Sequence, residues 1–580
     1  MTTQRNWRTA PERVLNRVHA RLAARARAAD GFVSQPEPRT VGFFAKGRQM
    51  CAGNLMFAGH FVEAPGAMLW DIPAPDAAFT EEINGFAWLD DLAAVGDIKA
   101  RKLAQDWLWD WIARYGRGTG PGWTPELTGR RLIRWVHHAL FVLRGLPSDK
   151  SEAFYAALGA QATFLARRGA SAPPGLARFE AMTGLLYAAL SLEGMETHVD
   201  PAREALGAEC RRQVSAQGGI PTRNPEELLE VFTLLTWAQA ALEEADLVPH
   251  KDHVEAIARI APTLRTLRHA DGGLARFHGG GRGLDGRLDM ALAVSGSKKR
   301  QADGLAMGFA RLSAGRTSIV IDAAVPPVGA ASGNAHASTL AFELTSGRRP
   351  LIVNCGSGSG FGEDWRRAGR ATLSHSVLCL QGYSSARLAA PRWVAQARRE
   401  LLEDAPKHVP IQMTHLAESL RFEGGHDGYV AVQGLTHARS LELSLDGRSL
   451  RGEDYLVALD APAKKRFDKA MDAVKLAGLP YEIRFHLHPE VDVTVDLGGN
   501  AVSMALRSGE IWVFRFEGGV ELALEPSVYL EKGRLRPRAT KQVVLSGRAM
   551  QYATRVRWSL AKAQETALAV RDLAQDPTDV

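Results

Sequence analysis

The stretch HADGGLARFHGGGRGLDGR, residues 269–287, divides this chain of 580 residues into two parts of different character. Its glycines interrupt every hydrophobic period, which is typical of a boundary between domains. Before it, apolar residues recur at steps of three and four; after it, they alternate or form short β-branched runs. The sequence therefore predicts a helical domain over residues 1–285, a β-domain over residues 286–560, and a polar tail or terminal helix over residues 561–580.

The helical part consists of amphipathic segments separated by short turns rich in glycine and proline. Clear examples are DWLWDWIARYG (106–116), RRLIRWVHHALFVL (130–143) and ELLEVFTLLTWAQAALEEA (227–245). Repeated helical hairpins of this length predict an (α/α) toroid.

The second part reads as a series of short strands. Examples are RTSIVIDAA (316–324), TLAFELTS (339–346), YVAVQG (429–434) and YEIRFHLH (481–488), with turn signals at Ser346–Gly347 and Asp446–Gly447. Many short strands with little helix between them predict an antiparallel β-sandwich.

Composition narrows the range of functions. The chain has 71 Lys and Arg against 64 Asp and Glu, a net charge of +7 without a concentrated basic stripe, so we expect no nucleic-acid partner. Its four cysteines are too sparse for a disulfide framework. The N-terminus lacks the apolar core of a signal peptide, and no uninterrupted apolar run could span a membrane, so we expect a cytoplasmic protein. Residues 13–28 are basic and amphipathic, which leaves peripheral association with the envelope open.

The densest polar cluster of the β-domain lies in GNAHASTLAFELTSGRRPLIVNCGSG and the following WRRAGRATLSHSVLCLQG. It places Asn334, His336, Asn354 and His375 on neighbouring strands or strand ends. Two imidazoles and an oxygen ligand (His336, His375 and Asn354) can hold zinc, although an amide oxygen carries no charge. The alternative is a pair of hydrogen-bonded core histidines.

These residues also carry a resemblance to a known family. In order and spacing, FAWLDDLAAVG, QGGIPTRNPEELLE, HADGGLARFHGG, HASTLAFEL, LIVNCG and SHSVLCL resemble the heparinase II/III family of polysaccharide lyases. The resemblance implies a toroid joined to a β-sandwich, and β-elimination on a polysaccharide that contains uronic acid. It also implies a neutraliser for the uronate carboxylate, a base for the C5 proton and an acid for the leaving oxygen.

The resemblance implies which residues should carry this chemistry, and several are replaced. His336, Asn354 and His375 match the places of the family's zinc ligands, with Asn354 where an Asp is usual. Asn334 stands where the catalytic His is expected, and Ser338 where an Asp closes the motif. In the toroid, Leu176 and Ala177 stand where an Asn–His pair is expected, and Glu227 where a Tyr is expected.

Other residues offer substitutes. His426 and Tyr429 in HDGYV, and Tyr383 after His375, are candidate acids or bases, with turn and capping hydrogen bonds as the alternative. Arg223 and Asn224 before a helix could hold a carboxylate, although Asn224 also fits a helix N-cap. Trp123, in a Gly-Pro-Gly loop, is a candidate sugar-stacking ring, whereas most tryptophans at helical spacing are expected in the core.

Three functions remain in view. The first is a lyase-like protein that cleaves an acidic polysaccharide by β-elimination at a cleft between toroid and sandwich. The second is a non-catalytic glycan-binding or envelope-assembly protein that kept the fold and lost the chemistry. The third is a hydrolase or transferase that uses a carboxylate pair among Glu226, Glu227 and Glu230, a cluster that a helix start also explains.

Overall fold

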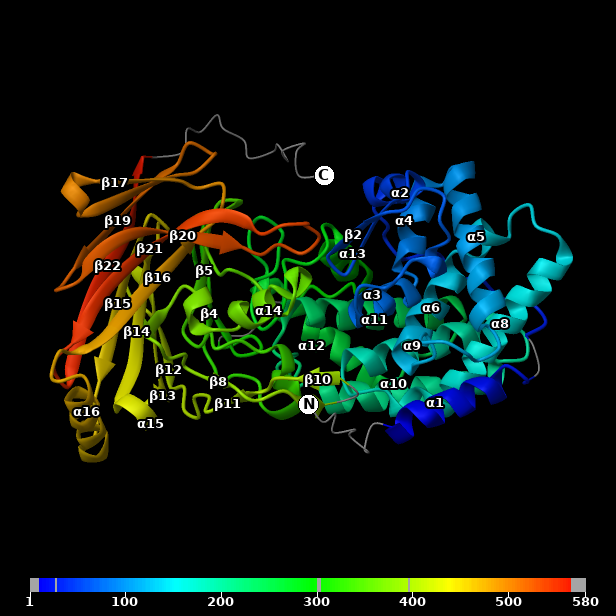
Figure 1. Ribbon diagram of the computed structural model, residues 1–580, viewed down its shortest axis with the longest axis horizontal. Coiled ribbons are helices and arrows are strands. Elements are labelled where there is room, and N and C mark those ends of the chain that lie inside the picture. Colours follow the sequence, from blue (N-terminus) through cyan, green and yellow to red (C-terminus); the bar gives the residue numbers. More distant parts are fainter. Residues whose placement is uncertain (1–9, 27–28, 300–303, 395–396, 565–580) are drawn as a thin grey trace.

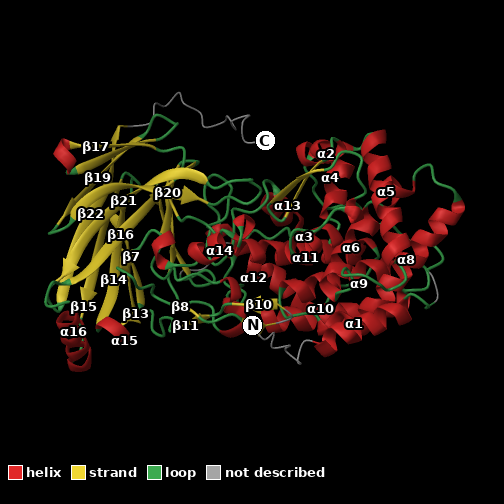
Figure 2. Cartoon of the chain, viewed as in Figure 1, coloured by secondary structure: helices red, strands yellow, loops and turns green. Residues whose placement is uncertain are grey.

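The computed structural model describes residues 10–26, 29–299, 304–394 and 397–564 (Figure 1). Helices form one side of the molecule and strands the other, which confirms the predicted toroid and β-sandwich (Figure 2). Residues 561–564 end the last strand, and the rest of the predicted tail lies outside the described residues.

In the toroid, helices pack on the next helix in sequence, as α11 does on α12, and on helices further along the chain, as α6 does on α9 and α9 on α11. Its helices are α1 (Ala10–Ala23), α2 (Phe44–Cys51), α3 (Ala77–Asn84), α4 (Ala87–Val95), α5 (Ile98–Tyr115), α6 (Pro125–His137), α7 (Ala139–Leu143), α8 (Ser148–Arg168), α9 (Leu176–Ser191), α10 (Val199–Gln213), α11 (Pro225–Glu244), α12 (Lys251–Leu267) and α13 (Arg287–Val294). A small hairpin, β1 (Asn54–Phe57) and β2 (His60–Glu63), packs on α2 and α3, and its turn contacts the sandwich half, because a Cβ on Gly59 would lie 1.9 Å from the carbonyl oxygen of Gly360.

Two glycines bring α6 and α9 into close contact. A Cβ on Gly129 of α6 would lie 2.2 Å from the carbonyl oxygen of Glu180, and one on Gly184 of α9 would lie 2.5 Å from the Cα of Gly129. Neither position can hold a larger residue without moving a backbone, so these glycines set the distance between the two helices.

The toroid core is aromatic. Trp88, Trp107, Trp111 and Trp135 are buried, as the helical spacing predicts. Arg131 lies among them with its guanidinium carbon 4.1 Å from the centre of the Trp111 ring, and burial lowers the pKa of Arg131 to about 9.

The sandwich consists of two antiparallel sheets with hydrogen-bonded orders β12-β13-β14-β15-β22-β19-β18-β17 and β20-β21-β16-β6-β5-β4-β3, and β7 also pairs with β16. The strands are β3 (Phe309–Ala314), β4 (Thr317–Asp322), β5 (Phe342–Ser346), β6 (Arg349–Val353), β7 (Leu378–Leu380), β12 (Ile411–His415), β13 (Ser419–Tyr429), β14 (Leu435–Ser444), β15 (Ser449–Val457), β16 (Leu479–Leu487), β17 (Asp492–Asp496), β18 (Ala501–Ala505), β19 (Ile511–Glu517), β20 (Glu521–Tyr529), β21 (Arg538–Ala549) and β22 (Ala553–Gln564). Short pairs outside the sheets are β8 (Arg387–Leu388) with β11 (Leu402–Glu403), and β9 (Arg392–Val394) with β10 (Ala397–Arg399).

The predicted turns at Gly347 and Gly447 are confirmed, and the predicted strand YVAVQG is wrong. Gly347 and Gly447 have φ of 57° and 69° and connect β5 to β6 and β14 to β15. YVAVQG is not a strand: β13 ends at Tyr429, and Val430–Gln433 form the short helix α15, which packs on α16 (Ala461–Ala473). This tertiary contact overrides the alternating pattern, and Gly434, with φ of 70°, lies directly against α16.

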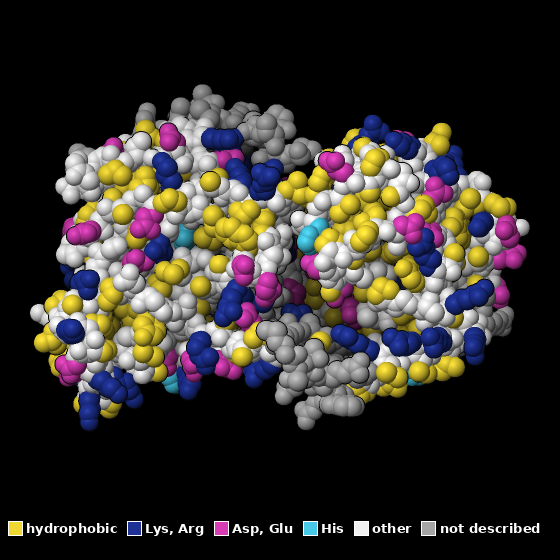
Figure 3. Space-filling model, in the orientation of Figure 1, with side chains coloured by type: hydrophobic (Ala, Val, Ile, Leu, Met, Phe, Trp, Pro, Cys, Tyr) yellow, Lys and Arg dark blue, Asp and Glu magenta, His cyan; other side chains and the backbone are white. Residues whose placement is uncertain are grey.

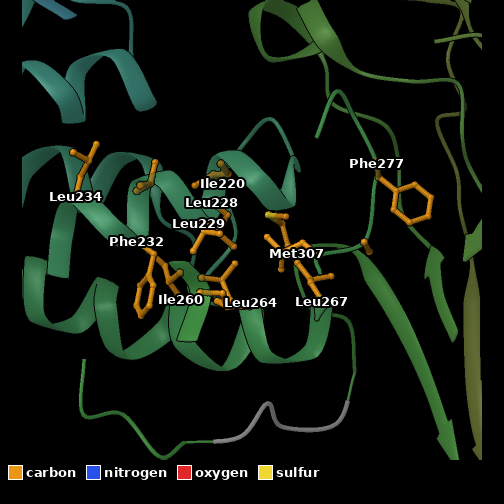
Figure 4. Packing of buried hydrophobic residues seen from close by; sticks show 14 of the residues in the cluster. Ile220, Leu228, Leu229, Phe232, Leu234, Ile260, Leu264, Leu267, Phe277 and Met307 are labelled. Atoms are coloured by element: carbon orange, nitrogen blue, oxygen red, sulfur yellow. The ribbon is translucent and has the colours of Figure 1, made fainter. Parts of the chain in front are cut away.

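The two halves share one hydrophobic core. The last toroid helix, α13, ends at Val294, beyond the predicted boundary at residue 285, and the first sandwich strand begins at Phe309. Just before that strand, Met307 inserts beside α11 and α12, near Leu228, Leu229 and Leu264 (Figure 4). A Cβ on Gly219 would lie 2.8 Å from the Met307 side chain, so the contact is close.

Candidate functional site

A cleft of about 940 Å³ lies between the toroid and the sandwich, and a recess between the two halves is visible in Figure 3. Its toroid wall comes from the starts of α6, α9 and α11 and from parts of α1 and α3. Its sandwich wall comes from the short 3-10 helix Gly329–Asn334 and from Arg399 on β10. Ala330, Ala331 and Gly333 in that wall have small side chains or none, and this leaves the space open.

The cleft brings together the positions at which the family resemblance implies catalysis. Leu176, Ala177 and Glu227 line it from the toroid, and Asn334 lines it from the sandwich. Asn334 is exposed at the end of its 3-10 helix, and Glu227 is half-buried in the first turn of α11. Burial outweighs nearby charges and raises the pKa of Glu227 above its ordinary value.

His278 is a cleft residue that the sequence reasoning missed. It is 1% exposed, has a positive φ of 49°, and lies at the end of the HADGGLARFH segment that carried the resemblance. Its Nδ1 accepts a hydrogen bond of 3.2 Å from the backbone N–H of His336, and its Nε2 lies 3.3 Å from Asp322 Oδ2. Nδ1 is therefore occupied by a hydrogen bond, whereas Nε2 lies beside the Asp322 carboxylate without hydrogen-bond geometry.

The guanidinium of Arg223, which from the sequence alone is expected to hold a ligand carboxylate, is engaged by the protein itself. Its guanidinium donates to Asp322 Oδ1 at 2.6 Å and to four backbone carbonyls of the segments that flank β3 and β4. Ser338, at the place where the family motif would have an Asp, donates to the other oxygen of Asp322 at 2.7 Å. Burial would raise the pKa of Asp322, but Arg223 and His278 together hold it well below its ordinary value. Asp322, which the sequence reasoning did not single out, is thus the centre of a buried interdomain network.

Asn224 is the N-cap of α11. Its side-chain oxygen accepts hydrogen bonds from the backbone N–H groups of Glu226 and Glu227, at 3.0 and 3.2 Å. The N-cap interpretation is confirmed, and this oxygen is not free to bind substrate.

The histidine pair of the predicted metal site does converge. His336 Nδ1 lies 2.9 Å from His375 Nε2, and His375 Nδ1 donates to the carbonyl of Ala371 at 2.8 Å. This arrangement makes His336 Nδ1 the donor in the imidazole pair. Asn354 uses its amide oxygen to accept the Ser376 N–H at 3.0 Å.

This donor set does not fit a zinc ion. Two neutral imidazoles are bonded to each other, the amide oxygen is occupied, and the set contains no anionic ligand. In the described part of the chain, no group of three or more His, Cys, Asp or Glu side chains is placed to hold a metal ion. We therefore assign these histidines a hydrogen-bonding role.

His426 and Tyr429 lie in the sandwich core, where they cannot act on a substrate in the cleft. Each is 1% exposed. His426 Nε2 lies 3.2 Å from His437 Nδ1, whose other nitrogen lies 2.8 Å from Asp454 Oδ1, and the Tyr429 hydroxyl donates to the Leu378 carbonyl. Tyr383 is 50% exposed after β7, and the described walls of the cleft do not include it.

Trp123 lines the cleft but is only 4% exposed. Its indole N–H donates to the Tyr115 carbonyl at 2.9 Å, and its ring packs against Trp111 and Phe164. Its ring is therefore packed in the core although the residue lines the cleft, and it offers little exposed face on which a sugar could stack.

The carboxylate pair of the third hypothesis does not form. Glu226 pairs with Lys532, Glu230 pairs with Arg287, and of these glutamates only Glu227 lies in the described wall of the cleft.

Comparison with known proteins places this geometry in context. Residues 296–559 match the family model described as Heparinase II/III-like, C-terminal. FtsZ-localized protein C of Caulobacter vibrioides is 30% identical over 552 residues, which cover 92% of this chain and 91% of that protein. The crystal structure of heparinase III superposes with a TM-score of 0.69 at 13% identity, over 96% of this chain and 90% of that one. A heparan sulfate lyase of Pedobacter heparinus gives a TM-score of 0.55 at 15% identity, over 96% and 89%.

No helix in the described ranges is both long and apolar enough to cross a membrane.

Proposed function

Since the chain belongs to the heparinase II/III-like family, we propose that it is a glycan-binding protein that keeps the lyase fold without performing β-elimination, and that it acts in envelope assembly at the division site. One observation carries this proposal. The cleft of the fold is open, while Leu176, Ala177, Glu227 and Asn334 occupy the positions at which the family's chemistry is expected.

Elimination needs groups that this cleft does not offer at those positions. Leucine and alanine side chains cannot transfer a proton, and the Asn334 amide neither gains nor loses one near neutral pH. Glu227, when ionised, repels a uronate carboxylate instead of neutralising it. His278 is close, but its two nitrogens face the His336 backbone and Asp322, so it is poorly placed to take the C5 proton.

A binding role agrees with the size of the cleft. A volume of about 940 Å³ between two domains is typical of sites that hold small ligands or a few sugar units. The Arg223–Asp322 network fixes the two walls relative to each other, which reduces the cost of ordering them around a ligand.

The location at the division site is proposed by similarity to a relative that is named for its localisation with FtsZ. The outer face of α1 supports contact with the envelope, because Val14, Leu15, Val18 and Leu22 are each 41% to 54% exposed. Arg21 and Arg25 are exposed next to Leu22 or just beyond it in sequence, and such a composition suits a surface of anionic lipid. A fluorescent fusion should co-localise with FtsZ in the native host.

Two measurements on the purified chain test the glycan part. Oligosaccharides of glucuronate, alginate, N-acetylglucosamine and glucosamine are titrated calorimetrically, and the same mixtures are monitored for the ultraviolet absorbance of unsaturated uronates. We expect binding of at least one oligomer and no rise in absorbance, with an active lyase as the positive control. A rise in absorbance would restore the elimination hypothesis, and the absence of binding to every oligomer would refute the proposal.

The Asn334→Trp variant locates the binding. Asn334 is exposed at the cleft, so a bulky side chain there should fill it and weaken binding by about tenfold or more. Gln412→Trp, at an exposed position on β12 away from the cleft, is the matched control and should leave the affinity unchanged.

A further inference from the structure

We propose that the cleft binds a sugar that is joined through a phosphate to a membrane lipid, an inference that rests on the proposed function. The observation behind it is the position of α1, which forms part of the cleft wall with one side and presents apolar residues to solvent with the other. A single helix thus places the cleft beside the surface that is proposed to contact the envelope.

One side of α1 belongs to the cleft. Arg13, Asn16 and Arg17 line it, at the three- and four-residue spacing of one helix face. Asn16 is 4% exposed, and its side-chain oxygen accepts a hydrogen bond of 2.9 Å from Arg168 on α8, which holds this side of α1 against the toroid. Arg17 is exposed and has no ion-pair or hydrogen-bond partner among the residues that the structure describes. Its guanidinium is therefore available to a ligand.

Arginines form a row that runs from the cleft toward the apolar side of α1. Arg13, Arg17 and Arg21 are four residues apart, so they follow one another along about 12 Å of the helix. Four residues exceed one helical turn by about 40°, and each step of the row therefore turns toward the side on which Val18 and Leu22 are exposed. The row joins the cleft to the apolar side of the helix.

The sandwich adds an aromatic ring and a further cation at this rim of the cleft. Trp393 on β9 is 38% exposed, and the guanidinium carbon of Arg13 lies 5.8 Å from the centre of its ring. Arg399, on the paired strand β10, packs over Gly333 in the cleft wall. In Figure 1, β10 and α1 lie along the same edge of the molecule. A partly exposed tryptophan suits the interface between lipid and water, and this one lies where the arginine row begins.

The cations and the carboxylates of the cleft come from different elements. The elements α1 and β10 supply Arg13, Arg17 and Arg399, whereas α3, α6 and α11 supply Glu81, Glu126 and Glu227. The remaining arginine of the lining, Arg130, donates to Glu180 at 2.5 Å and is already paired. Arginine binds phosphate through two parallel hydrogen bonds, and carboxylates accept hydrogen bonds from sugar hydroxyls. A sugar phosphate that enters along α1 therefore meets the cations first and the carboxylates at the toroid wall.

The phosphate of a glycolipid fits this arrangement better than the carboxylates of a free polysaccharide. A soluble chain gains nothing from apolar side chains next to the site. A glycolipid, in contrast, holds its phosphate at the membrane surface, between its sugar and its hydrocarbon chain. With Val18 and Leu22 at the boundary of the hydrocarbon, the arginine row lies at the level of the phosphates, and the cleft lies at the level of the sugar.

Binding to vesicles separates the contribution of the sugar from that of its phosphate. Phosphatidylcholine vesicles of equal negative charge carry phosphatidylglycerol, polyprenyl phosphate, or polyprenyl phosphate that bears N-acetylglucosamine. We expect the full chain to co-sediment with the sugar-bearing vesicles at least about tenfold more tightly than with either other kind. Free N-acetylglucosamine 1-phosphate, measured by calorimetry, should bind more weakly than these vesicles because it lacks the lipid.

Two variants assign this preference to the cleft and to the arginine row. Asn334→Trp fills the cleft, so the sugar-bearing vesicles should bind it no more tightly than phosphatidylglycerol vesicles do. Arg17→Gln removes one cation next to an anionic surface and should weaken binding to the sugar-bearing vesicles by about fivefold. Arg451→Gln, at an exposed position on β15, is the matched control. Melting temperatures show whether a loss reflects the site or the fold.

Three outcomes would overturn the inference, and they differ in what they leave standing. Equal binding to all three kinds of vesicle would refute it, while glycan binding, measured with the soluble oligomers, stands. Tighter binding of free N-acetylglucosamine 1-phosphate than of the vesicles would assign the cleft to a soluble sugar phosphate. If neither the soluble oligomers bind nor the sugar on the vesicles adds to binding, the proposed function fails together with the inference.

Discussion

Arg223 at the start of α11 and Asp322 at the end of β4 form a 2.6 Å ion pair that joins the toroid to the sandwich. The side chains are 10% and 0% exposed, so the pair lies almost entirely out of water. Both partners have further hydrogen bonds, Arg223 to backbone carbonyls and Asp322 to Ser338, which a buried pair requires.

Removing one partner of this pair should destabilise the protein strongly. Arg223→Met leaves the Asp322 carboxylate buried without its counter-ion, so we expect a loss of about 3–5 kcal/mol in the free energy of unfolding. Denaturant titration of Arg223→Met, Asp322→Asn and the double variant gives the coupling free energy between the two residues. Arg259→Ala, which breaks an exposed pair with Glu255 on α12, is the control and should cost less than about 1 kcal/mol. A similar small loss in Arg223→Met would contradict the interdomain role.

Protein purified without added metal should contain far less than one zinc per chain. The reason is that His336 and His375 bond to each other and that Asn354 supplies no charge. Elemental analysis checks the content, and a chelator should leave the melting temperature unchanged. Stoichiometric zinc that disappears in His375→Ala would show that the family's metal site survives.

The free energy of unfolding should fall as the pH drops below about 6.5, which is the ordinary pKa of a histidine side chain. Burial lowers the pKa of His137 to about 3, of His253 to about 4 and of His488 to about 3. A histidine whose pKa is lower in the folded state binds a proton more readily in the unfolded state. Its contribution to the free energy of unfolding is therefore complete above about pH 6.5 and is lost progressively as the pH falls below that value. For each such residue the loss between pH 7 and pH 5 is about 2 kcal/mol.

His137→Phe isolates one of these contributions. Neither nitrogen of His137 has a hydrogen-bond partner among the described residues, and the ring packs against Tyr187 and Trp237. Phenylalanine keeps the shape of this contact without a titrating group. The slope of the unfolding free energy against pH, below about pH 6.5, should therefore correspond to about one proton fewer taken up on unfolding. An unchanged slope would mean that His137 does not contribute to the acid sensitivity.

Contact with an anionic membrane should depend on the exposed face of α1. Val18→Glu and Leu22→Glu place charges on a face where the native residues are 46% and 47% exposed, so folding should be little affected. We expect each to weaken co-sedimentation with vesicles that contain phosphatidylglycerol by about tenfold, through lost apolar burial and added repulsion. Val432→Glu, at an exposed position on α15, is the control. Equal sedimentation of all variants would exclude this face of α1.

The order of elements could be predicted because it depends on local patterns. The period of α5, α6 and α11, the N-cap at Asn224 and the turns at Gly347 and Gly447 are recorded in neighbouring residues and agree with the structure. The short helix α15 was missed because a contact with α16, distant in sequence, outweighs the alternation of YVAVQG.

The sequence by itself determined that a helical domain precedes a β-domain, and its resemblance to the family predicted that Leu176, Ala177, Glu227 and Asn334 stand where the family's catalytic residues are expected. Only the tertiary structure decided that these four positions share one cleft, that Arg223 forms an ion pair with Asp322, and that His426 and Tyr429 are core residues. The reason is physical: periodicity reports which side of an element is buried, whereas the partner of a charged or polar group depends on segments about a hundred residues away.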